Sequence, residues 1–208
     1  MTPDPVLEEG VLHGDRLDEA VAVSVRAFSD DPFFRYLFPN DEKRERSTAI
    51  MHRVALRAVA PLGTTRTALI DGRVAGVAVW LPPGRWPFPP MVQVRQLFGT
   101  LPAFYGAMRS LAQVRPLLRD VVKAHPRAPH WYLQLLMVDP PYQRQGIGAV
   151  LQAPELHACD RDATPAWVET QKVENLAYYG RFGFRVIAEH KAEEGVSIWS
   201  LKRDPIPA

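Results

Sequence analysis

The sequence has little cysteine, little net charge and no long apolar run. A single cysteine, Cys159, excludes a disulfide within the chain and is typical of a cytoplasmic protein. The formal net charge of +2 comes without a basic tail, so the composition indicates neither a nucleic-acid partner nor an anionic membrane. No apolar stretch approaches ~18 residues, and the first five residues lack the basic and apolar regions of a signal peptide. We therefore expect a cytoplasmic protein that binds neither nucleic acid nor membrane.

The sequence also lacks the residue spacing of a metal-binding site. The six histidines, at positions 13, 52, 125, 130, 157 and 190, show no zinc-ligand spacing, so no metal is predicted. His130 stands at the start of an apolar run, where it either lines a cleft or has a structural role.

What the chain does contain is enough apolar sequence for one substantial domain. Its 208 residues are 47% hydrophobic, which is typical of a globular protein. We predict a single domain over residues 1–208. Within it, the proline-rich residues 82–129 form a helical insertion that either caps the active cleft or is purely structural, and residues 130–190 form the core of the binding site.

Hydrophobic periodicity and turn residues predict the other elements. Asp71-Gly72 between two apolar runs is typical of a hairpin with a type I′ turn. The insertion carries two or three short helices punctuated by Pro102 and Pro116. Strands are expected at 6–13, 66–70, 73–81, 166–171, 184–190 and 196–201, and helices from Asn40 or Asp41 to Ala58 and, capped by Asn175, from Leu176 to Phe182.

The most informative stretch runs from Trp131 to Ala149. An apolar run that ends at Asp139-Pro140-Pro141 reads as a mostly buried strand, and a helical pattern opens after Gly146 and Gly148. A strand, a glycine turn and a helix start place free N–H groups and the positive end of a helix dipole together, which favours a phosphate group. The alternative is an ordinary turn whose glycines allow close packing.

The residues after Gly148 exclude two common phosphate sites. A dinucleotide fingerprint needs glycine where Leu151 stands, and a nucleotide P-loop needs lysine where Ala149 stands. A second motif follows downstream, Glu169-Thr170-Gln171 and then Asn175, Tyr179 and Gly183-Phe184. The two motifs together resemble the GNAT superfamily of acyl-CoA N-acyltransferases. Ala27-Phe28, Asp31-Pro32, Val77–Trp80 and Pro154 are similar to the puromycin N-acetyltransferase-like branch.

The resemblance implies an α/β fold. Its central sheet is mixed, mostly antiparallel and six- to seven-stranded, with helices on both faces and with the fourth and fifth strands splayed at a bulge. Acetyl-CoA enters the opening from one side and the acceptor amine from the other. The resemblance implies that the cofactor-binding residues are the backbone of Leu136, Met137 and Val138 for the pantetheine arm, Gln143, Arg144, Gln145, Gly146, Ile147, Gly148 and Ala149 for the pyrophosphate, and Asn175 and Tyr179 near the acetyl end.

Amide formation from a thioester needs a neutral amine, a stabilised oxyanion and a proton for the thiolate. A backbone N–H near Met137 or Val138 can meet the second need. Tyr179 is the candidate proton donor, since a phenol stays protonated at neutral pH; its alternative is an aromatic core residue, which is also how we interpret Tyr178. Glu169 is the candidate base or ammonium anchor and is expected to act through water; its alternative is a hydrogen-bonded strand-end carboxylate. Cys159 lies ~20 Å along the helix from Gly146, which is too far for a cysteine nucleophile.

These residues predict an enzyme that moves the acetyl group of acetyl-CoA to a small-molecule primary amine by direct attack, as a monomer or homodimer. The aromatic segment 29–39 is either a short helix packed on the core or one wall of a substrate cleft, with Asp31 facing an ammonium group. Aromatic residues, Trp86 among them, favour an apolar or aromatic acceptor. The predicted substrate-binding residues are Asp31, Phe34, Trp80, Tyr105, Trp131 and Glu169. Alternatives are a protein N-terminal or lysine acetyltransferase and a non-catalytic acyl-CoA sensor.

Overall fold

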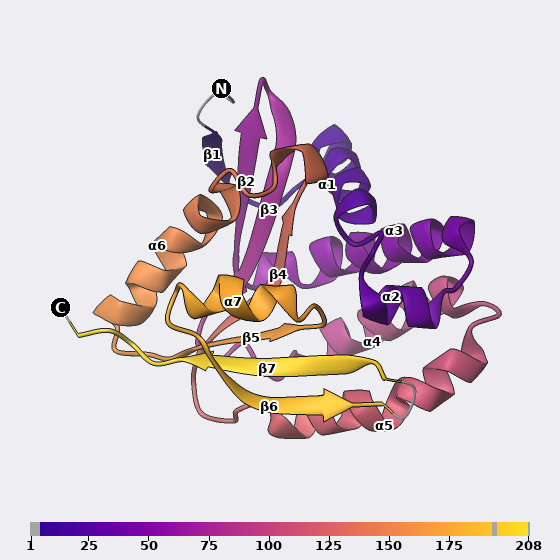
Figure 1. The fold of residues 1–208 in the computed structure, drawn as a ribbon. Helices are drawn as coiled ribbons and strands as arrows, with labels where there is room; N and C mark the ends of the chain where they lie inside the picture. Colours follow the sequence, from indigo (N-terminus) through magenta and orange to yellow (C-terminus); the bar gives the residue numbers. More distant parts are fainter. Residues whose placement is uncertain (1–4, 193–194, 208) are drawn as a thin grey trace.

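The structure is a computed structural model that describes residues 5–192 and 195–207. It contains one mixed sheet of seven strands in the order β1-β2-β3-β4-β5-β7-β6 (Figure 1). All neighbouring strands are antiparallel except β4 and β5, which are parallel. The strands are β1 (Val6–Glu9), β2 (Thr64–Ile70), β3 (Arg73–Leu81), β4 (Trp131–Val138), β5 (Ala166–Thr170), β6 (Arg185–Lys191) and β7 (Ser197–Arg203).

Helices cover both faces of this sheet (Figure 1). They are α1 (Gly14–Ala27), α2 (Pro32–Leu37), α3 (Asp41–Ala58), α4 (Pro90–Thr100), α5 (Met108–Ala124), α6 (Ile147–Arg161) and α7 (Glu174–Gly180), with short 3₁₀ turns η1 (Ala60–Leu62), η2 (Leu101–Phe104) and η3 (Pro140–Tyr142). The predicted hairpin is present, since Asp71 and Gly72 between β2 and β3 both have positive φ, as a type I′ turn requires.

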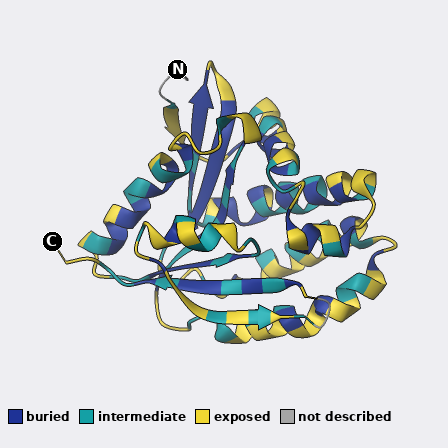
Figure 2. Ribbon diagram, in the orientation of Figure 1, coloured by how far each residue is buried: buried dark blue, intermediate teal, exposed yellow. Residues whose placement is uncertain are grey.

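The core lies on both faces of the central strands. Along β3, Val77 and Val79 pack toward α1 and α3, whereas Ala78 and Trp80 pack toward α6. Figure 2 shows β2 and β3 as almost continuously buried strands. β3 reads as an apolar run, as expected for a strand that is buried on both faces, whereas β2, with Thr64, Thr65 and Arg66, was located by the Asp71-Gly72 turn signal.

The parallel pair β4 and β5 parts after a short contact. Only Trp131 to Leu133 pair with β5, although β4 continues to Val138. Opposite β3, the register skips one residue of β4 between Leu133 and Leu135, so Gln134 is the extra residue of a β-bulge. The predicted splay at a bulge is therefore confirmed, and the bulge lies where the pairing with β5 ends.

Two local predictions were wrong. Asn175 does not cap α7, because the cap position is Val173 and Asn175 lies in the first turn of the helix. Pro116 does not end a helix, because α5 runs through it. The burial of Val114 and Leu117 on either side offsets the cost of an interior proline. Tertiary packing overrode the local signal at this position.

The two long helices of the insertion 82–129 pack on different parts of the domain. α4 packs on α3, with Gly99 close to Val54, and α5 packs on α2 and the last two strands. In residues 5–192 and 195–207, no helix is long and apolar enough to cross a membrane.

Close packing of α6 on the sheet requires glycine at one position of β3. A Cβ added at Gly76 would lie 2.9 Å from the Met137 carbonyl oxygen and 3.1 Å from Leu151. We expect Gly76→Ala to lower the free energy of unfolding by about 1–3 kcal/mol through overpacking. Gly180→Ala is the matched control, since it meets open space on α7 and should stabilise by up to about 1 kcal/mol. Urea unfolding of both variants measures the difference, and equal stabilities would contradict the packing argument.

Candidate active site

The turn between β4 and α6 presents backbone donors at a helix start. Gly146 caps α6 with φ 86°, and Arg144 two residues earlier also has positive φ, at 61°. In the part of the chain that the structure describes, no residue accepts a hydrogen bond from the N–H groups of Gly146, Ile147 or Gly148. Alternating backbone conformations of this kind form an anion-binding concavity, and the dipole of the 15-residue helix adds to it. The arrangement suits a phosphate group.

Two glutamine side chains of the turn form hydrogen bonds to its own backbone. Gln143 donates to the Val138 carbonyl at 3.0 Å, and Gln145 donates to the Pro141 carbonyl at 2.8 Å. Both glutamines therefore support the loop, and the exposed Arg144 supplies positive charge at the surface. Phosphate binding would fall mainly to backbone N–H groups, with Arg144 as the nearby cation.

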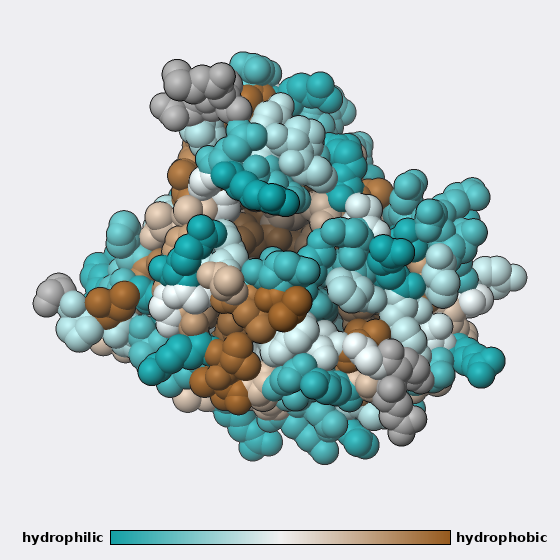
Figure 3. All heavy atoms as spheres, in the orientation of Figure 1, coloured by the Kyte–Doolittle hydropathy of each residue, from teal (hydrophilic) through white to brown (hydrophobic). Residues whose placement is uncertain are grey.

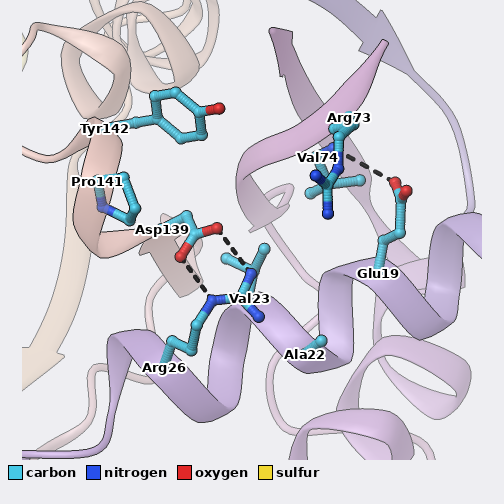
Figure 4. A pocket seen from close by; sticks show the side chains of 9 residues that line it. All are labelled: Glu19, Ala22, Val23, Arg26, Arg73, Val74, Asp139, Pro141 and Tyr142. Atoms are coloured by element: carbon cyan, nitrogen blue, oxygen red, sulfur yellow. Dashed lines mark hydrogen bonds and ion pairs between the residues drawn. The ribbon is translucent and has the colours of Figure 1, made fainter. Parts of the chain in front are cut away.

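An ion pair holds α1 against the start of this turn. Arg26 on α1 donates to both oxygens of Asp139, at 2.8 and 2.7 Å, and Asp139 directly follows β4. The hydrogen bond to Asp139 raises the pKa of Arg26. Beside this pair lies a cavity of about 360 Å³, lined among others by Glu19, Arg73 and Tyr142 (Figure 4). The bidentate geometry fixes where the chain leaves β4 for the loop.

Tyr178 joins α7 to the same turn. Its hydroxyl accepts a hydrogen bond from Gln152 at 2.6 Å and lies 2.5 Å from the position of a Cβ on Gly148. Only glycine leaves room for the hydroxyl there. Burial raises the pKa of Tyr178 to about 12. Tyr178 is thus a packing residue, as expected, and its contact with Gly148 ties the second motif to the first.

Tyr179 occupies the next position of α7. It is 6% exposed and packs edge-on against Tyr178 and Phe184. Burial raises the pKa of Tyr179 well above its usual value, so the phenol stays protonated across the neutral range. Asn175, one turn earlier, donates to Thr170 Oγ1 at 2.8 Å and ties α7 to the end of β5. Figure 3 shows the surface hollowed between α7 and the turn before α6, with apolar atoms on its floor.

Glu169 lies on the opposite face of the sheet from Tyr179. Along β5, Ala166 and Val168 pack with Tyr179 and α6, whereas Glu169 lines a cavity of about 190 Å³ beneath α5. Its Oε1 accepts hydrogen bonds from His125 Nδ1, at 3.0 Å, and from Trp167 Nε1. Its Oε2 is buried and has no hydrogen-bond partner among the described residues. An acceptor atom without a partner is a place for a ligand's N–H group.

Aromatic side chains form much of this second cavity, which we call the Glu169 cavity. Its lining residues are Trp86, Leu118, Val121, Val122, His125, Tyr132, Glu169, Gln171 and Ile198. Burial first, and then the charge of the Glu169 carboxylate and a side-chain hydrogen bond to it, raise the pKa of Tyr132 well above its usual value. Gln134 Oε1, on the bulge residue, is a second buried acceptor without a partner in the described chain.

Of the six predicted substrate-binding residues, Glu169 alone lines the Glu169 cavity. Asp31 is 2% exposed and caps α2 by accepting from the N–H groups of Phe33 and Phe34, so the aromatic segment forms a short packed helix. Burial raises the pKa of Asp31. Phe34 stacks on His52, Trp80 is fully buried, Trp131 packs on the α6 face and Tyr105 is 87% exposed. The structure does not bring these five residues to Glu169.

Sequence reasoning missed His125 and Tyr132 as neighbours of Glu169. His125 ends α5, and its ring lies 4.7 Å from Tyr132 and 4.2 Å from Trp86, between ring centroids. The only available signal was that His125 and His130 both precede β4 closely. The contact between the two histidines, and the contact of His125 with Glu169 44 positions later, produce no periodic pattern in the sequence.

The comparison with family models bears on the C-terminal part of the chain, which carries these features. Residues 121–203 match the family model described as "Acetyltransferase (GNAT) domain". The match begins in α5 and includes the turn before α6, Glu169 and α7. Over residues 121–203 the chain is similar to GNAT acetyltransferases. A GNAT acetyltransferase domain supports acyl transfer from acetyl-CoA.

Solved structures share this GNAT fold over almost the whole chain. A Corynebacterium glutamicum protein described as histone acetyltransferase HPA2 and related acetyltransferase is 17% identical, with a TM-score of 0.67 and 99% of each chain covered. Arylalkylamine N-acetyltransferase 2 from Aedes aegypti is 13% identical, with a TM-score of 0.56, and 95% of this chain and 98% of that chain are covered. PaiA N-acetyltransferase from Thermoplasma acidophilum, solved with coenzyme A, is 11% identical, with a TM-score of 0.54, and 96% and 99% are covered. The predicted GNAT fold is confirmed.

The backbone at Gly146 provides a direct test of the phosphate site. A side chain at φ 86° is strained, and valine there would also crowd the free N–H groups, although no protein atom lies within 4 Å of the added Cβ. We expect Gly146→Val to abolish measurable coenzyme A binding in titration calorimetry while the protein stays folded. The control is Gly195→Val, which has a similar φ of 84° and open surroundings in the turn before β7. Tight binding by Gly146→Val would refute the phosphate site.

Proposed function

We propose that the chain is an N-acetyltransferase that moves the acetyl group of acetyl-CoA directly to the primary amine of a small apolar or aromatic molecule. One observation carries the proposal. Where β4 and β5 part, a buried phenol, Tyr179, lies toward one face of the sheet and a buried carboxylate, Glu169, lies toward the other. In this proposal Tyr179 gives a proton to the thiolate from one side of the opening, and Glu169 accepts a proton from the amine on the other side.

The side of the opening that carries α6 and α7 suits the cofactor. The free N–H groups at Gly146 to Gly148 would hold the pyrophosphate, and β4 beyond Leu133 has no β5 partner along its edge. The backbone of Leu136 and Met137 would therefore be available to the pantetheine arm. Val138 is available only in part, because its carbonyl already accepts from Gln143. Bound there, acetyl-CoA supplies an activated acetyl group as a thioester.

The other side suits a small amine. The Glu169 cavity has a volume of about 190 Å³, and its walls combine the rings of Trp86 and Tyr132 with aliphatic residues of α5. Trp86 and the end of α5 come from the insertion 82–129, so we propose that this part of the insertion covers the acceptor. The unpartnered Oε2 of Glu169 is the acceptor for an amine N–H.

The reaction balances with these two groups alone. The amine nitrogen forms a bond to the acetyl carbon and the carbon–sulfur bond breaks, so the nitrogen loses one proton and the thiolate gains one. Glu169 Oε2 receives the first proton, and Tyr179 gives the second. Water returns a proton to the Tyr179 phenolate, and Glu169 releases one. An α-amine with a pKa of ~8 suits this weak base better than a lysine amine near ~10.4.

The proposed function is tested by release of free coenzyme A thiol across a panel of amines. The panel contains aromatic and aliphatic primary amines of matched size, and peptides with a free N-terminus or a single lysine. Turnover with aromatic small amines at the highest kcat/KM supports the proposal. Highest turnover with peptides favours a protein acetyltransferase. Coenzyme A binding without turnover on any amine favours the acyl-CoA sensor.

Tyr179→Phe removes the proposed proton donor and keeps the ring in its packed position. We expect kcat to fall by about 10²-fold or more, because the thiolate would leave without a proton. The dissociation constant for coenzyme A should change little. Steady-state kinetics and calorimetry measure the two quantities. Unchanged turnover would show that Tyr179 is only a core aromatic residue.

Glu169→Gln keeps the shape of the side chain and removes its basicity. We expect kcat/KM for the amine to fall by ~10²–10⁴-fold, the range of general base catalysis. Glu174→Gln is the control, since Glu174 is an exposed carboxylate in the first turn of α7. A fall in Glu169→Gln no larger than in the control would mean that Glu169 serves only a hydrogen bond.

A further inference from the structure

A chain of buried hydrogen bonds leads away from Glu169. His125 Nδ1 lies 3.0 Å from Glu169 Oε1, and His125 Nε2 lies 2.9 Å from His130 Nε2. His130 Nδ1 lies 2.8 Å from the Ala128 carbonyl oxygen. Both histidines are 5% exposed, so protein groups rather than water are the main hydrogen-bond partners of their ring nitrogens.

The direction of each hydrogen bond follows from the carbonyl at the end of the chain. The Ala128 carbonyl only accepts, so His130 Nδ1 carries a hydrogen. Burial lowers the pKa of His130, so the ring is neutral and its Nε2 is an acceptor. His125 Nε2 therefore carries a hydrogen and donates it to His130. One more proton must then lie between His125 Nδ1 and Glu169 Oε1, because two lone pairs 3.0 Å apart repel.

Three features place that proton on His125. Trp167 Nε1 also donates to Glu169 Oε1, which makes this oxygen an acceptor of two donors. His125 stands at the C-terminal end of the 17-residue helix α5, where the helix dipole favours a cation. The rings of Trp86 and Tyr132 lie against the imidazole, and aromatic rings attract a cation. These contacts favour a Glu169 carboxylate that accepts from a His125 ring with a hydrogen on each nitrogen.

We infer that His125, oriented by His130, is the positioning residue for Glu169 in the proposed transfer, holding Oε1 so that Oε2 alone faces the amine. This inference rests on the proposed function. His125 acts through Glu169: it keeps the carboxylate ionised and in one orientation, and the amine proton goes to Oε2.

Two substitutions of His125 separate packing from hydrogen bonding and charge. His125→Phe keeps a ring against Trp86 and loses both hydrogen bonds. His125→Gln keeps an N–H donor for Glu169 and loses the charge. We expect His125→Phe to lower kcat at least about tenfold, a share of the ~10²–10⁴ that a general base provides, with coenzyme A affinity unchanged. His125→Gln should recover part of this loss.

The pH profile gives a readout that a purely structural role would not move. The titratable groups that face His125 are Glu169 on β5, Tyr132 on β4 and His130 before β4. A buried carboxylate without a cation is disfavoured, so the acidic limb of the kcat/KM profile should move to higher pH in His125→Gln. A lower rate at every pH without this movement would overturn the inference.

A double-mutant cycle completes the test. If His125 acts through Glu169, the losses from His125→Phe and Glu169→Gln are strongly non-additive in kcat. Additive losses overturn the inference while leaving the proposed function intact. ¹⁵N NMR of histidine-labelled wild type provides a readout without turnover. It should show hydrogens on both nitrogens of His125 and on Nδ1 alone of His130. A neutral His125 ring overturns the inference, whereas correct protonation in a protein that acetylates no amine overturns the proposed function alone.

Discussion

The parting of β4 from β5 is the constraint on which the rest of the structure depends. Pairing ends at Leu133 and Val168, and the bulge at Gln134 falls at the same place. The extra residue also exchanges the faces of β4: Leu133 and then Leu136 pack toward α6, whereas Leu135 and Met137 pack toward α1. Without the bulge, simple alternation would place Leu135 on the α6 face. The bulge therefore keeps both faces of the strand apolar while its edge turns away from β5. An open strand edge inside a sheet leaves backbone groups without partners, and such an edge is stable only where a ligand or water satisfies them.

Polar groups around the opening range from buried, such as Asp139 and Thr170, to exposed, such as Arg26, and most of them are paired. Arg26 holds Asp139 at the top of β4, Asn175 holds Thr170 at the end of β5, and Trp167 and His125 share one oxygen of Glu169. The low dielectric of the interior strengthens the bonds to the buried Thr170 and Glu169 side chains and makes a buried polar atom without a partner costly. Two of the buried acceptors that have no partner among the described residues, Glu169 Oε2 and Gln134 Oε1, directly follow Val168 and Leu133, the last paired residues. Their position at the opening distinguishes a site for a hydrogen-bond donor from a packing defect.

The sequence predicted the features that depend on local chemistry and on strong periodicity. The β2–β3 hairpin, the central strand, the glycine turn and the helix after it all lie where the residues indicated, because Asp71-Gly72 and Gly146 tolerate the positive φ that their turns require and most other residues do not. The cap of α7 was misplaced because the Asn175 side chain bonds Thr170 instead of its own helix. The aromatic residues predicted to contact substrate were chosen by composition, and composition does not tell a buried Trp80 from one that lines a cavity. His125 was missed because its partner lies on another element, and only the fold brings the two together.

The neighbours Tyr178 and Tyr179 show how one short helix meets two requirements. Successive residues of a helix point about 100° apart, so the two phenols serve different surroundings. Tyr178 fills the space above Gly148 and bonds Gln152 of α6, while Asn175 holds the start of α7 to β5. Together these contacts attach α7 both to the helix that begins after Gly146 and to the strand that carries Glu169. A seven-residue helix is too short to be stable by itself, so its position is set by these tertiary contacts. The location of the Tyr179 phenol relative to the free N–H groups is therefore a property of the Tyr178–Gly148 contact, and a substitution that enlarges Gly148 would displace both tyrosines together.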